Sequence, residues 1–495
     1  MNFKRQRLVG GHRVRKCQTC RDRKVNCDKQ EPFCNACTTR GLLCHGYTGP
    51  DTFIYVNLSD HPAPRSSSES NTLTPLRTQA NRIRVPALIL RQRQTATAPN
   101  PVPLTAWTPD PVWNYREFFL SRLVGNAARV PTSGLAALLC DFLNQPSRPG
   151  TAGYKCMEAL TTGYYLMRTA GPGACVQGIE AYDHAIHAIQ AVVNGPCAMA
   201  CEPDILLSIM SLCLYENIIV TRPRSWVTHY QGISKMIELH GPDHYRSGYN
   251  RSLLLAFRYT IIVSAGTLRQ RCFLAEPGWR QAIQLSEAEA RDPFETILNI
   301  AVEVPGLLYG VDRLTSGLLA NMEVVVLSAT LERTMLELQE WRYTLFRSGG
   351  SSSVHNLDVV SALAFYHMVF LLLEDLCYQL QVPWLPAASV LPTPLNGRPS
   401  TIRAQHKHLV ASQILHLAEQ SINADTRIYG VLRFIMALHV AHDHLLLGSL
   451  EMHALNNLMN TVMAGEHGFQ MARRHDGQYT SFADCLETEE EEELS

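Results

Sequence analysis

The chain has 495 residues, of which 46% are hydrophobic, and its 44 basic and 44 acidic side chains balance. The neutral sum hides an asymmetry, because residues 1–50 hold eleven Lys or Arg and three Asp or Glu, a balance of +8, and the remainder carries −8. A basic end on an acidic chain suits contacts with nucleic-acid phosphates. The first residues are basic and not apolar, so we expect no secretory signal and no disulfide framework.

Six cysteines form a repeated pattern after this basic start. They are Cys17, Cys20, Cys27, Cys34, Cys37 and Cys44, spaced C-x2-C-x6-C-x6-C-x2-C-x6-C. Thiolates at such spacing bind zinc. Six thiolates could serve one tetrahedral zinc with two left over, or two zincs if two of them bridge. The repeat favours the second arrangement. So few apolar residues lie between the cysteines that we expect this segment to be unfolded without metal.

The run CQTCRDRKVNCD from Cys17 to Asp28, together with Pro32 and the closing Gly41-Leu-Leu-Cys44, resembles the fungal zinc binuclear cluster DNA-binding domain. The resemblance implies that Cys17 and Cys34 bridge two zinc ions. It further implies two pairs of terminal ligands, Cys20 with Cys27 and Cys37 with Cys44. The first short helix, expected from about Gln18 to Asn26, then enters the DNA major groove and reads a CGG-like triplet.

Basic side chains surround the second cysteine. Arg23 and Lys24 occupy the base-contacting positions of the family that the run resembles, and Arg or Lys pairs best with guanine in the major groove. Arg21 is expected to contact a phosphate, and Arg15 and Lys16 add positive charge beside the cluster. We therefore predict DNA binding through these five residues.

Residues 48–106 read as a disordered linker, because Pro and Ser at their density oppose a packed core. They show no apolar heptads, so a dimerising zipper is not expected here. Any homodimer must form elsewhere, or the protein binds DNA as a monomer. The basic arm, residues 1–16, precedes the cluster at 17–44.

Residues 107–477 predict a large helical domain. Apolar residues recur at helical spacing in Gly178–Val193, Ile205–Val220, Ser225–Leu239, Arg251–Thr267, Asp358–Leu380, Gln405–Asn423 and Tyr429–Leu447. Strand-like alternation is scarce, so the fold class is mainly α. The most apolar run, Val359 to Leu373, is shorter than the roughly 20 residues of a membrane span, so we expect a buried helix there and no membrane contact.

Several motifs in this domain resemble the fungus-specific transcription factor domain. They include Leu214-Tyr-Glu216, Trp226-Val-Thr-His229-Tyr-Gln-Gly232, His240-Gly-Pro242, Phe273 to Trp279 and Asp292-Pro-Phe-Glu295. The resemblance would cover about residues 110 to 470. It implies an all-helical regulatory region for dimerisation or for the response to a small-molecule effector.

The acidic tail, residues 478–495, is typical of a solvated segment, and its mixed acidic and apolar composition also occurs in activation segments. Together the patterns predict a nuclear, zinc-dependent regulator that binds specific double-stranded DNA at RNA polymerase II promoters. We expect no catalytic residues and no enzyme. One alternative is a zinc-stabilised adaptor or co-regulator without specific DNA binding of its own.

Overall fold

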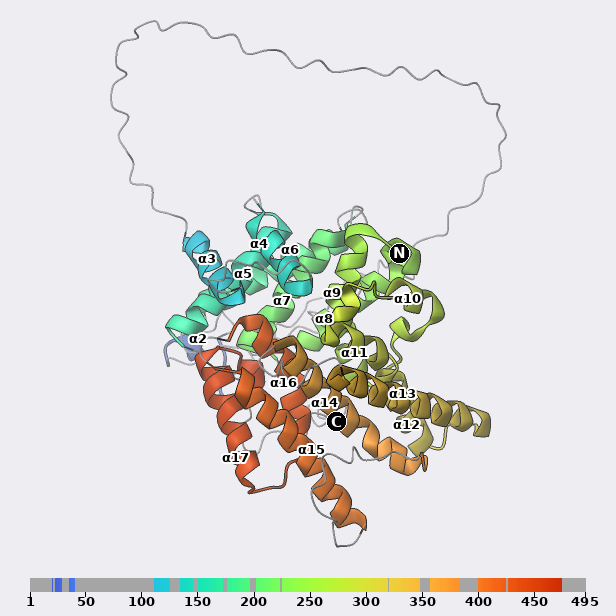
Figure 1. Cartoon of the computed structure of the whole chain (residues 1–495). Coiled ribbons are helices and arrows are strands. Elements are labelled where there is room, and N and C mark those ends of the chain that lie inside the picture. The colour runs from blue at the N-terminus through green and yellow to red at the C-terminus, as the bar shows by residue number, and fades with distance from the viewer. Residues whose placement is uncertain are drawn as a thin grey trace, which may run out of the picture. The chain divides into compact units, whose positions relative to one another are not determined.

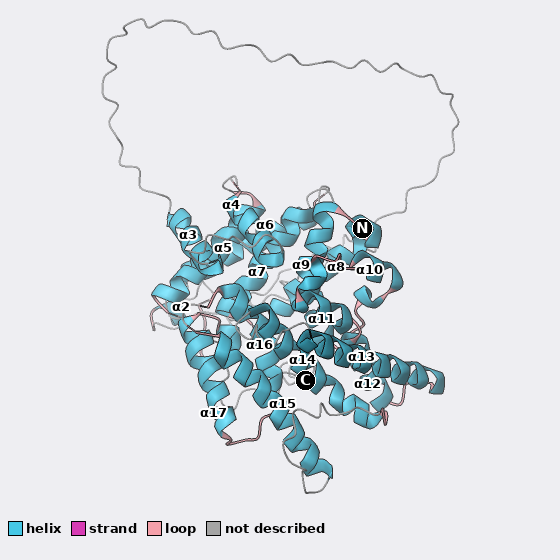
Figure 2. Cartoon of the chain, in the orientation of Figure 1, coloured by secondary structure: helices cyan, strands magenta, loops and turns pink. Residues whose placement is uncertain are grey.

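The computed structural model describes thirteen stretches of the chain. They are residues 20, 23–28, 35–40, 111–124, 134–145, 150–171, 176–195, 202–222, 225–318, 320–347, 357–382, 399–423 and 426–473. The predicted basic arm, linker and acidic tail lie outside the described residues. Within the described ranges every regular element is helical and no strand occurs (Figure 2). The predicted fold class, mainly α, is therefore confirmed.

The helical domain follows the chain from residue 111 (Figure 1). Its first half holds α3 (Pro111–Val124), α4 (Gly134–Asn144), α5 (Ala152–Thr169), α6 (Val176–Val193), α7 (Glu202–Ile219), α8 (Ser225–His240), η3 (Pro242–Tyr245), α9 (Gly248–Thr267), η4 (Phe273–Ala275) and α10 (Pro277–Ala282). Its second half holds η5 (Glu289–Arg291), α11 (Pro293–Ala301), α12 (Val304–Thr315), α13 (Asn321–Arg347), α14 (Leu357–Gln379), α15 (Pro399–Ser421), α16 (Ile428–His444), α17 (Leu450–Asn457), η7 (Leu458–Glu466) and η8 (Gln470–Ala472).

Local sequence explains where several of these helices begin. Asp292 caps α11, because its carboxylate accepts from the backbone N–H of Phe294 at 2.8 Å, and Pro293 occupies the first helical position. Ser449 caps α17 in the same way, accepting from the N–H of Met452 at 3.1 Å. These caps satisfy N–H groups that an α-helix cannot bond within itself.

Two glycines let α5 and α6 approach each other closely. A Cβ added to Gly178 would lie 3.1 Å from the Cα of Gly163, and a Cβ added to Gly163 would lie 2.6 Å from the ring of Tyr215. The ring of Tyr215, from α7, stacks on that of Tyr182 with centroids 4.3 Å apart. Helices α5, α6 and α7 therefore form one tightly packed layer.

Helix α14 is buried along most of its length and packs against α11, α15 and α16. It spans 23 residues, longer than the apolar run that the sequence analysis singled out. By length and composition alone this helix and the segment Pro293–Thr315 could each cross a membrane, but core helices pass the same test. Because the residues of α14 are enclosed by neighbouring helices, we interpret it as a core helix, as predicted.

Candidate nucleic-acid interface and helical core

The described part of the cysteine region begins at a helix end. The backbone N–H of Val25 donates to the carbonyl of Cys20 at 3.0 Å, and Lys24 between them has a positive φ of 52°. This closure over six residues with a left-handed residue before the last is the Schellman ending of a helix. Residues 25–28 are not helical. The expected helix from Gln18 to Asn26 is therefore wrong at its C-terminal end, because Lys24 turns the chain out of the helix.

Arg23 and Lys24 form the turn that ends this helix, and both side chains are exposed. A residue other than glycine in the left-handed region costs on the order of 1–2 kcal/mol, so the turn is held by its surroundings. The predicted base-reading pair is thus presented directly after a predicted zinc ligand. Arg15, Lys16 and Arg21 lie outside the described residues.

Two of the predicted zinc ligands lie side by side. The Sγ atoms of Cys20 and Cys37 are 3.7 Å apart and both residues are fully buried. A disulfide bond is about 2.05 Å long, so the two sulfurs are not joined. Thiolates that approach one metal centre with Zn–S bonds of about 2.3 Å are spaced in this way. The pair therefore fits a zinc cluster.

The remaining ligands complete this comparison only in part. Cys27 is half-buried, whereas Cys17, Cys34 and Cys44 lie outside the described residues. For that reason the described residues contain no group of three or more His, Cys, Asp or Glu side chains placed to hold a metal ion. The bridging roles of Cys17 and Cys34 stay a prediction.

An aspartate joins the two halves of the cysteine repeat. Asp28 accepts from the backbone N–H groups of Asn35 at 3.0 Å and Ala36 at 3.1 Å. These are the first residues of α2 (Asn35–Thr38), so the carboxylate of the first half caps the helix of the second half. The sequence analysis missed this contact, although Asp28 directly follows a predicted ligand, because seven residues separate cap and helix.

Within the helical domain, two of the quoted motifs meet at a buried carboxylate. Glu216 of α7 accepts from the Tyr182 hydroxyl at 2.5 Å and from the backbone N–H of Thr221 at 2.8 Å. Because Tyr182 gives its proton to Glu216, the 2.7 Å contact with His229 requires Nε2–H of His229 to donate to the Tyr182 oxygen. The network links α6, α7 and α8.

Burial sets the protonation of this network. It raises the pKa of Glu216, an effect that the hydrogen bonds from Thr221 and Tyr182 oppose. Burial also lowers the pKa of His229 to about 4, so this imidazole stays neutral near pH 7. Glu216 is 1% exposed. The motifs around it therefore build the core and do not form an open acid–base site.

A third quoted motif supports the junction of α9 and α11. The guanidinium of Arg258, fully buried, donates to the carboxylate of Glu295 and to the side-chain carbonyl of Asn299. A buried ion pair of this kind is destabilising to break, because either charge would remain without compensation. The Asp292-Pro-Phe-Glu295 motif therefore combines a helix cap with one half of a buried ion pair.

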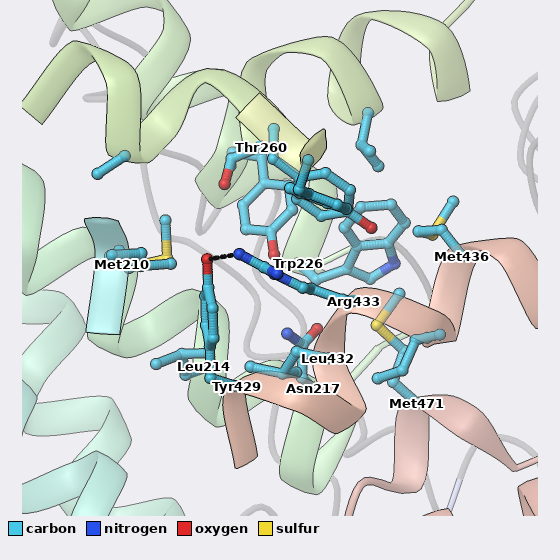
Figure 3. Close-up of a pocket in the computed structure, with 17 residues that line it drawn as sticks. Met210, Leu214, Asn217, Trp226, Thr260, Tyr429, Leu432, Arg433, Met436 and Met471 are labelled. Atoms are coloured by element: carbon cyan, nitrogen blue, oxygen red, sulfur yellow. Dashed lines mark hydrogen bonds between the residues drawn. The ribbon is translucent and has the colours of Figure 1, made fainter. Parts of the chain in front are cut away.

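A cavity of about 70 Å³ lies among α7, α8, α9, α11 and α16 (Figure 3). Arg433 of α16 crosses it, donating to the Tyr429 hydroxyl at 2.6 Å and to Asp358 at 2.6 Å. The guanidinium carbon lies 4.2 Å from the ring centre of Phe294. The cavity is thus mostly apolar, with one nearly buried cation in its wall.

Three buried polar atoms of the cavity wall have no hydrogen-bond partner among the described residues. They are Nε of Arg433, Oδ1 of Asn217 and the hydroxyl oxygen of Tyr259. Buried polar atoms are normally satisfied, so each invites a water or ligand atom. A cavity that binds benzene measures roughly 150 Å³. The present volume therefore suits a few waters or a small polar molecule.

Comparison with known proteins places these features in a family. Residues 15–52 match the Fungal Zn(2)-Cys(6) binuclear cluster domain, and residues 176–315 match the Fungal specific transcription factor domain. The second match covers the middle of the range, 110 to 470, that the motifs predicted. Both are domains of transcription factors, which are not enzymes. This confirms the prediction that the chain is not an enzyme.

One curated relative shows local similarity. "Uncharacterized protein AN5342" of Emericella nidulans is 28% identical over 115 residues, which are 21% of this chain and 24% of that protein. The chain thus matches about a quarter of the length of this relative. No solved structure matches the chain. With the cysteine cluster domain, which binds two zinc ions, followed by the helical domain, the chain belongs to the fungal Zn(2)-Cys(6) binuclear cluster transcription factors.

Proposed function

We propose that this chain is a nuclear, sequence-specific regulator of RNA polymerase II promoters that binds double-stranded DNA through its zinc cluster. The observation that carries the proposal is the exposed pair Arg23 and Lys24, held in a defined turn directly after the zinc ligand Cys20. Two adjacent cations on a metal-stabilised turn suit guanine O6 and N7 in the major groove. Their target is a CGG-like triplet.

The other basic residues supply affinity. Arg21, Arg15 and Lys16 contact DNA phosphates or lie near them, and the balance of +8 over residues 1–50 adds attraction that depends on salt. The two zinc ions share Cys17 and Cys34. Six thiolates and two Zn²⁺ carry a net charge of −2, which these cations offset.

The remaining chain organises control. The proposed order is a basic arm at 1–16, the cluster at 17–44, a linker at 48–106, the helical regulatory domain at 107–477 and an acidic tail at 478–495. The helical domain supports a homodimer and the response to an effector. The tail suits contact with the transcription machinery through its acidic and apolar composition.

The cavity crossed by Arg433 is the proposed effector site. Its wall offers a cationic N–H donor at Arg433 and a carbonyl acceptor at Asn217, and aromatic rings surround them. A small molecule with an acceptor and a donor on a short apolar body fits this chemistry. Thermal unfolding of the full chain with small amides and carboxylates tests the site. A stabilising compound should lose its effect in Asn217→Leu, whereas equal stabilisation of both proteins places it elsewhere.

A gel-shift experiment on the full chain tests the DNA proposal. We expect the zinc-loaded protein to bind a CGG-containing duplex more tightly than a scrambled duplex, and a chelator to abolish the difference. Binding at the non-specific level to both duplexes would overturn the proposal. That result would favour the alternative, a zinc-stabilised adaptor that acts through a DNA-bound partner.

A further inference from the structure

Helix α13 carries a row of exposed apolar side chains. Six of its large hydrophobic residues are 48 to 74% exposed, namely Met322, Val325, Val326, Leu336, Tyr343 and Phe346. Elsewhere in the described residues, exposed large apolar side chains are scattered over many elements. Contiguous exposed apolar surface of this kind marks an interaction site. The helix directly follows the residues that match the transcription factor domain.

The opposite face of α13 fixes the helix in the fold. Leu331, Met335 and Leu338 are buried, and the helix packs against α11 and α12. The Trp341 indole N–H donates to Thr296 at 2.8 Å, and Arg333 pairs with Glu303 at 3.0 Å. The exposed row therefore belongs to an ordered helix that is anchored on its other side.

The exposed row repeats every seven residues. Met322, Ala329, Leu336 and Tyr343 occupy one heptad position, and Val325 and Phe346 fall on the second apolar position of the same repeat. A seven-residue apolar repeat is typical of a helix that pairs with another helix. Over 27 residues such a seam is roughly 40 Å long. The spacing thus favours a helical partner over a flat surface.

The charges on this face favour a second copy of the same helix. It exposes two acidic residues, Glu332 and Glu340, and two basic residues, Arg333 and Arg347. A parallel pair in register would set Arg333 against Arg333 and Glu340 against Glu340. An antiparallel pair reverses one row, so that opposite charges approach each other.

We infer that α13 is a homodimer interface, in which two copies pair antiparallel with a twofold axis beside Leu336. Residues equally distant from the axis then meet, so Ala329 faces the second copy's Tyr343 and Val326 faces the second copy's Phe346. Arg333 lies one residue from the position opposite the second copy's Glu340. This deepens the homodimer of the proposed function and supplies a dimer contact that the segment after the cysteines lacks.

Sedimentation of the full chain over a concentration series tests the interface. We expect a monomer–dimer equilibrium in the wild type, and at least tenfold weaker dimerisation in Leu336→Asp, which places a carboxylate on each side of the axis. The matched control is Leu447→Asp, since Leu447 is 93% exposed but lies outside α13 and should leave the dimer unchanged. A monomeric wild type, or equal effects of both variants, would overturn the inference.

Charge exchange gives a second and independent readout. Glu340→Arg alone should weaken the dimer, because the new side chain approaches Arg333 of the second copy. Adding Arg333→Glu should restore it, although the internal pair with Glu303 is lost. Failure of the double variant to recover, with an unchanged thermal unfolding midpoint, would also contradict the antiparallel arrangement. Because sedimentation needs no DNA, a dimer that fails the gel shift would overturn only the DNA proposal.

Discussion

The carbonyl of Cys20 accepts from the backbone N–H of Val25 at 3.0 Å, across a turn in which Lys24 is left-handed. This bond links three roles within six residues. A predicted zinc ligand begins the turn, a predicted base-reading lysine occupies its strained position, and the half-buried Val25 follows. Metal binding and DNA reading are therefore coupled through the backbone, because displacing Cys20 would also displace Lys24.

Two substitutions separate the side chain of Lys24 from its backbone strain. Both Lys24→Ala and Lys24→Gly remove the proposed base contact, so each should weaken binding to the CGG duplex by about 1–3 kcal/mol while leaving non-specific binding nearly unchanged. Only glycine relieves the left-handed strain, so Lys24→Gly should exceed Lys24→Ala in stability by about 1 kcal/mol. Gel shifts and chelator-dependent unfolding measure the two effects.

A matched control for Lys24 is Arg21→Ala. Loss of a phosphate contact should weaken specific and non-specific binding alike and lower the salt dependence by about one unit. If Lys24→Gly bound the CGG duplex as tightly as the wild type, its side chain would not be a reader. Equal losses of specificity in Lys24→Ala and Arg21→Ala would contradict the division of roles.

Asp28 should matter for the fold of the cluster rather than for DNA reading. Asp28→Ala removes both acceptors from the N-terminus of α2, which should destabilise the zinc-loaded cluster by about 1 kcal/mol. Asp28→Asn keeps one acceptor and should lose less. Competition with a zinc chelator, followed by metal release, ranks the three proteins. A cluster that releases zinc equally readily in all three would show that the cap contributes no stability.

Cys34 is expected to serve both zinc ions. Cys34→Ser should therefore lower the metal content from two zinc ions towards none, whereas Cys27→Ser removes a terminal ligand and should leave one site less affected. Metal analysis after extensive dialysis measures the content. Two tightly held zinc ions in Cys34→Ser would exclude Cys34 as a bridge.

Regular apolar spacing made much of the fold predictable. The expected helices Gly178–Val193 and Ser225–Leu239 correspond to α6 (Val176–Val193) and α8 (Ser225–His240), since each has one apolar stripe facing the core. Helix α13 was not predicted. Its apolar residues lie both on the buried face and on the exposed heptad face, so no single stripe stands out.

The site was predictable in part for the same kind of reason. Cysteine spacing is local, so the metal ligands and the adjacent Arg23 and Lys24 could be proposed from the sequence. The cavity could not, because Asn217, Tyr259 and Arg433 come together only through helix packing. The Schellman ending at Lys24 was also missed, since glycine usually occupies that position.

Gly163 should be intolerant of a single methyl group. Its Cβ would lie 2.6 Å from the ring of Tyr215, which is fully buried and stacked on Tyr182 and so cannot move aside. We expect Gly163→Ala to destabilise the chain by about 1–3 kcal/mol through overpacking. The control is Gly232→Ala in α8, where nothing lies within 4 Å of the added Cβ. It should stabilise by about 0.5–1 kcal/mol, because alanine is the better helix former. Urea unfolding measures both, and equal changes would contradict the close packing.

His229 should make the helical domain less stable in acid. Its pKa is lowered by burial to about 4, whereas the unfolded imidazole titrates near 6.5. Between these values the unfolded state binds a proton that the folded state does not. Stability therefore falls as the pH drops from about 6.5 to about 4, by up to roughly 3 kcal/mol. Glu216, whose pKa is raised by burial, takes up a proton in the folded state and offsets part of this loss.

His229→Gln tests this contribution, because glutamine can still donate to the Tyr182 hydroxyl but does not titrate. Its urea unfolding free energy should fall less steeply than that of the wild type below pH 6.5, and the two should converge in slope above that pH. All tryptophans lie outside residues 17–44, so their fluorescence follows the helical domain and not acid release of zinc. The exposed His184 of the neighbouring helix α6 provides the control, since His184→Gln should keep the wild-type slope. If His229→Gln also kept that slope, the imidazole would have to be solvated or paired in the folded protein, and the buried network with Glu216 would be incorrect.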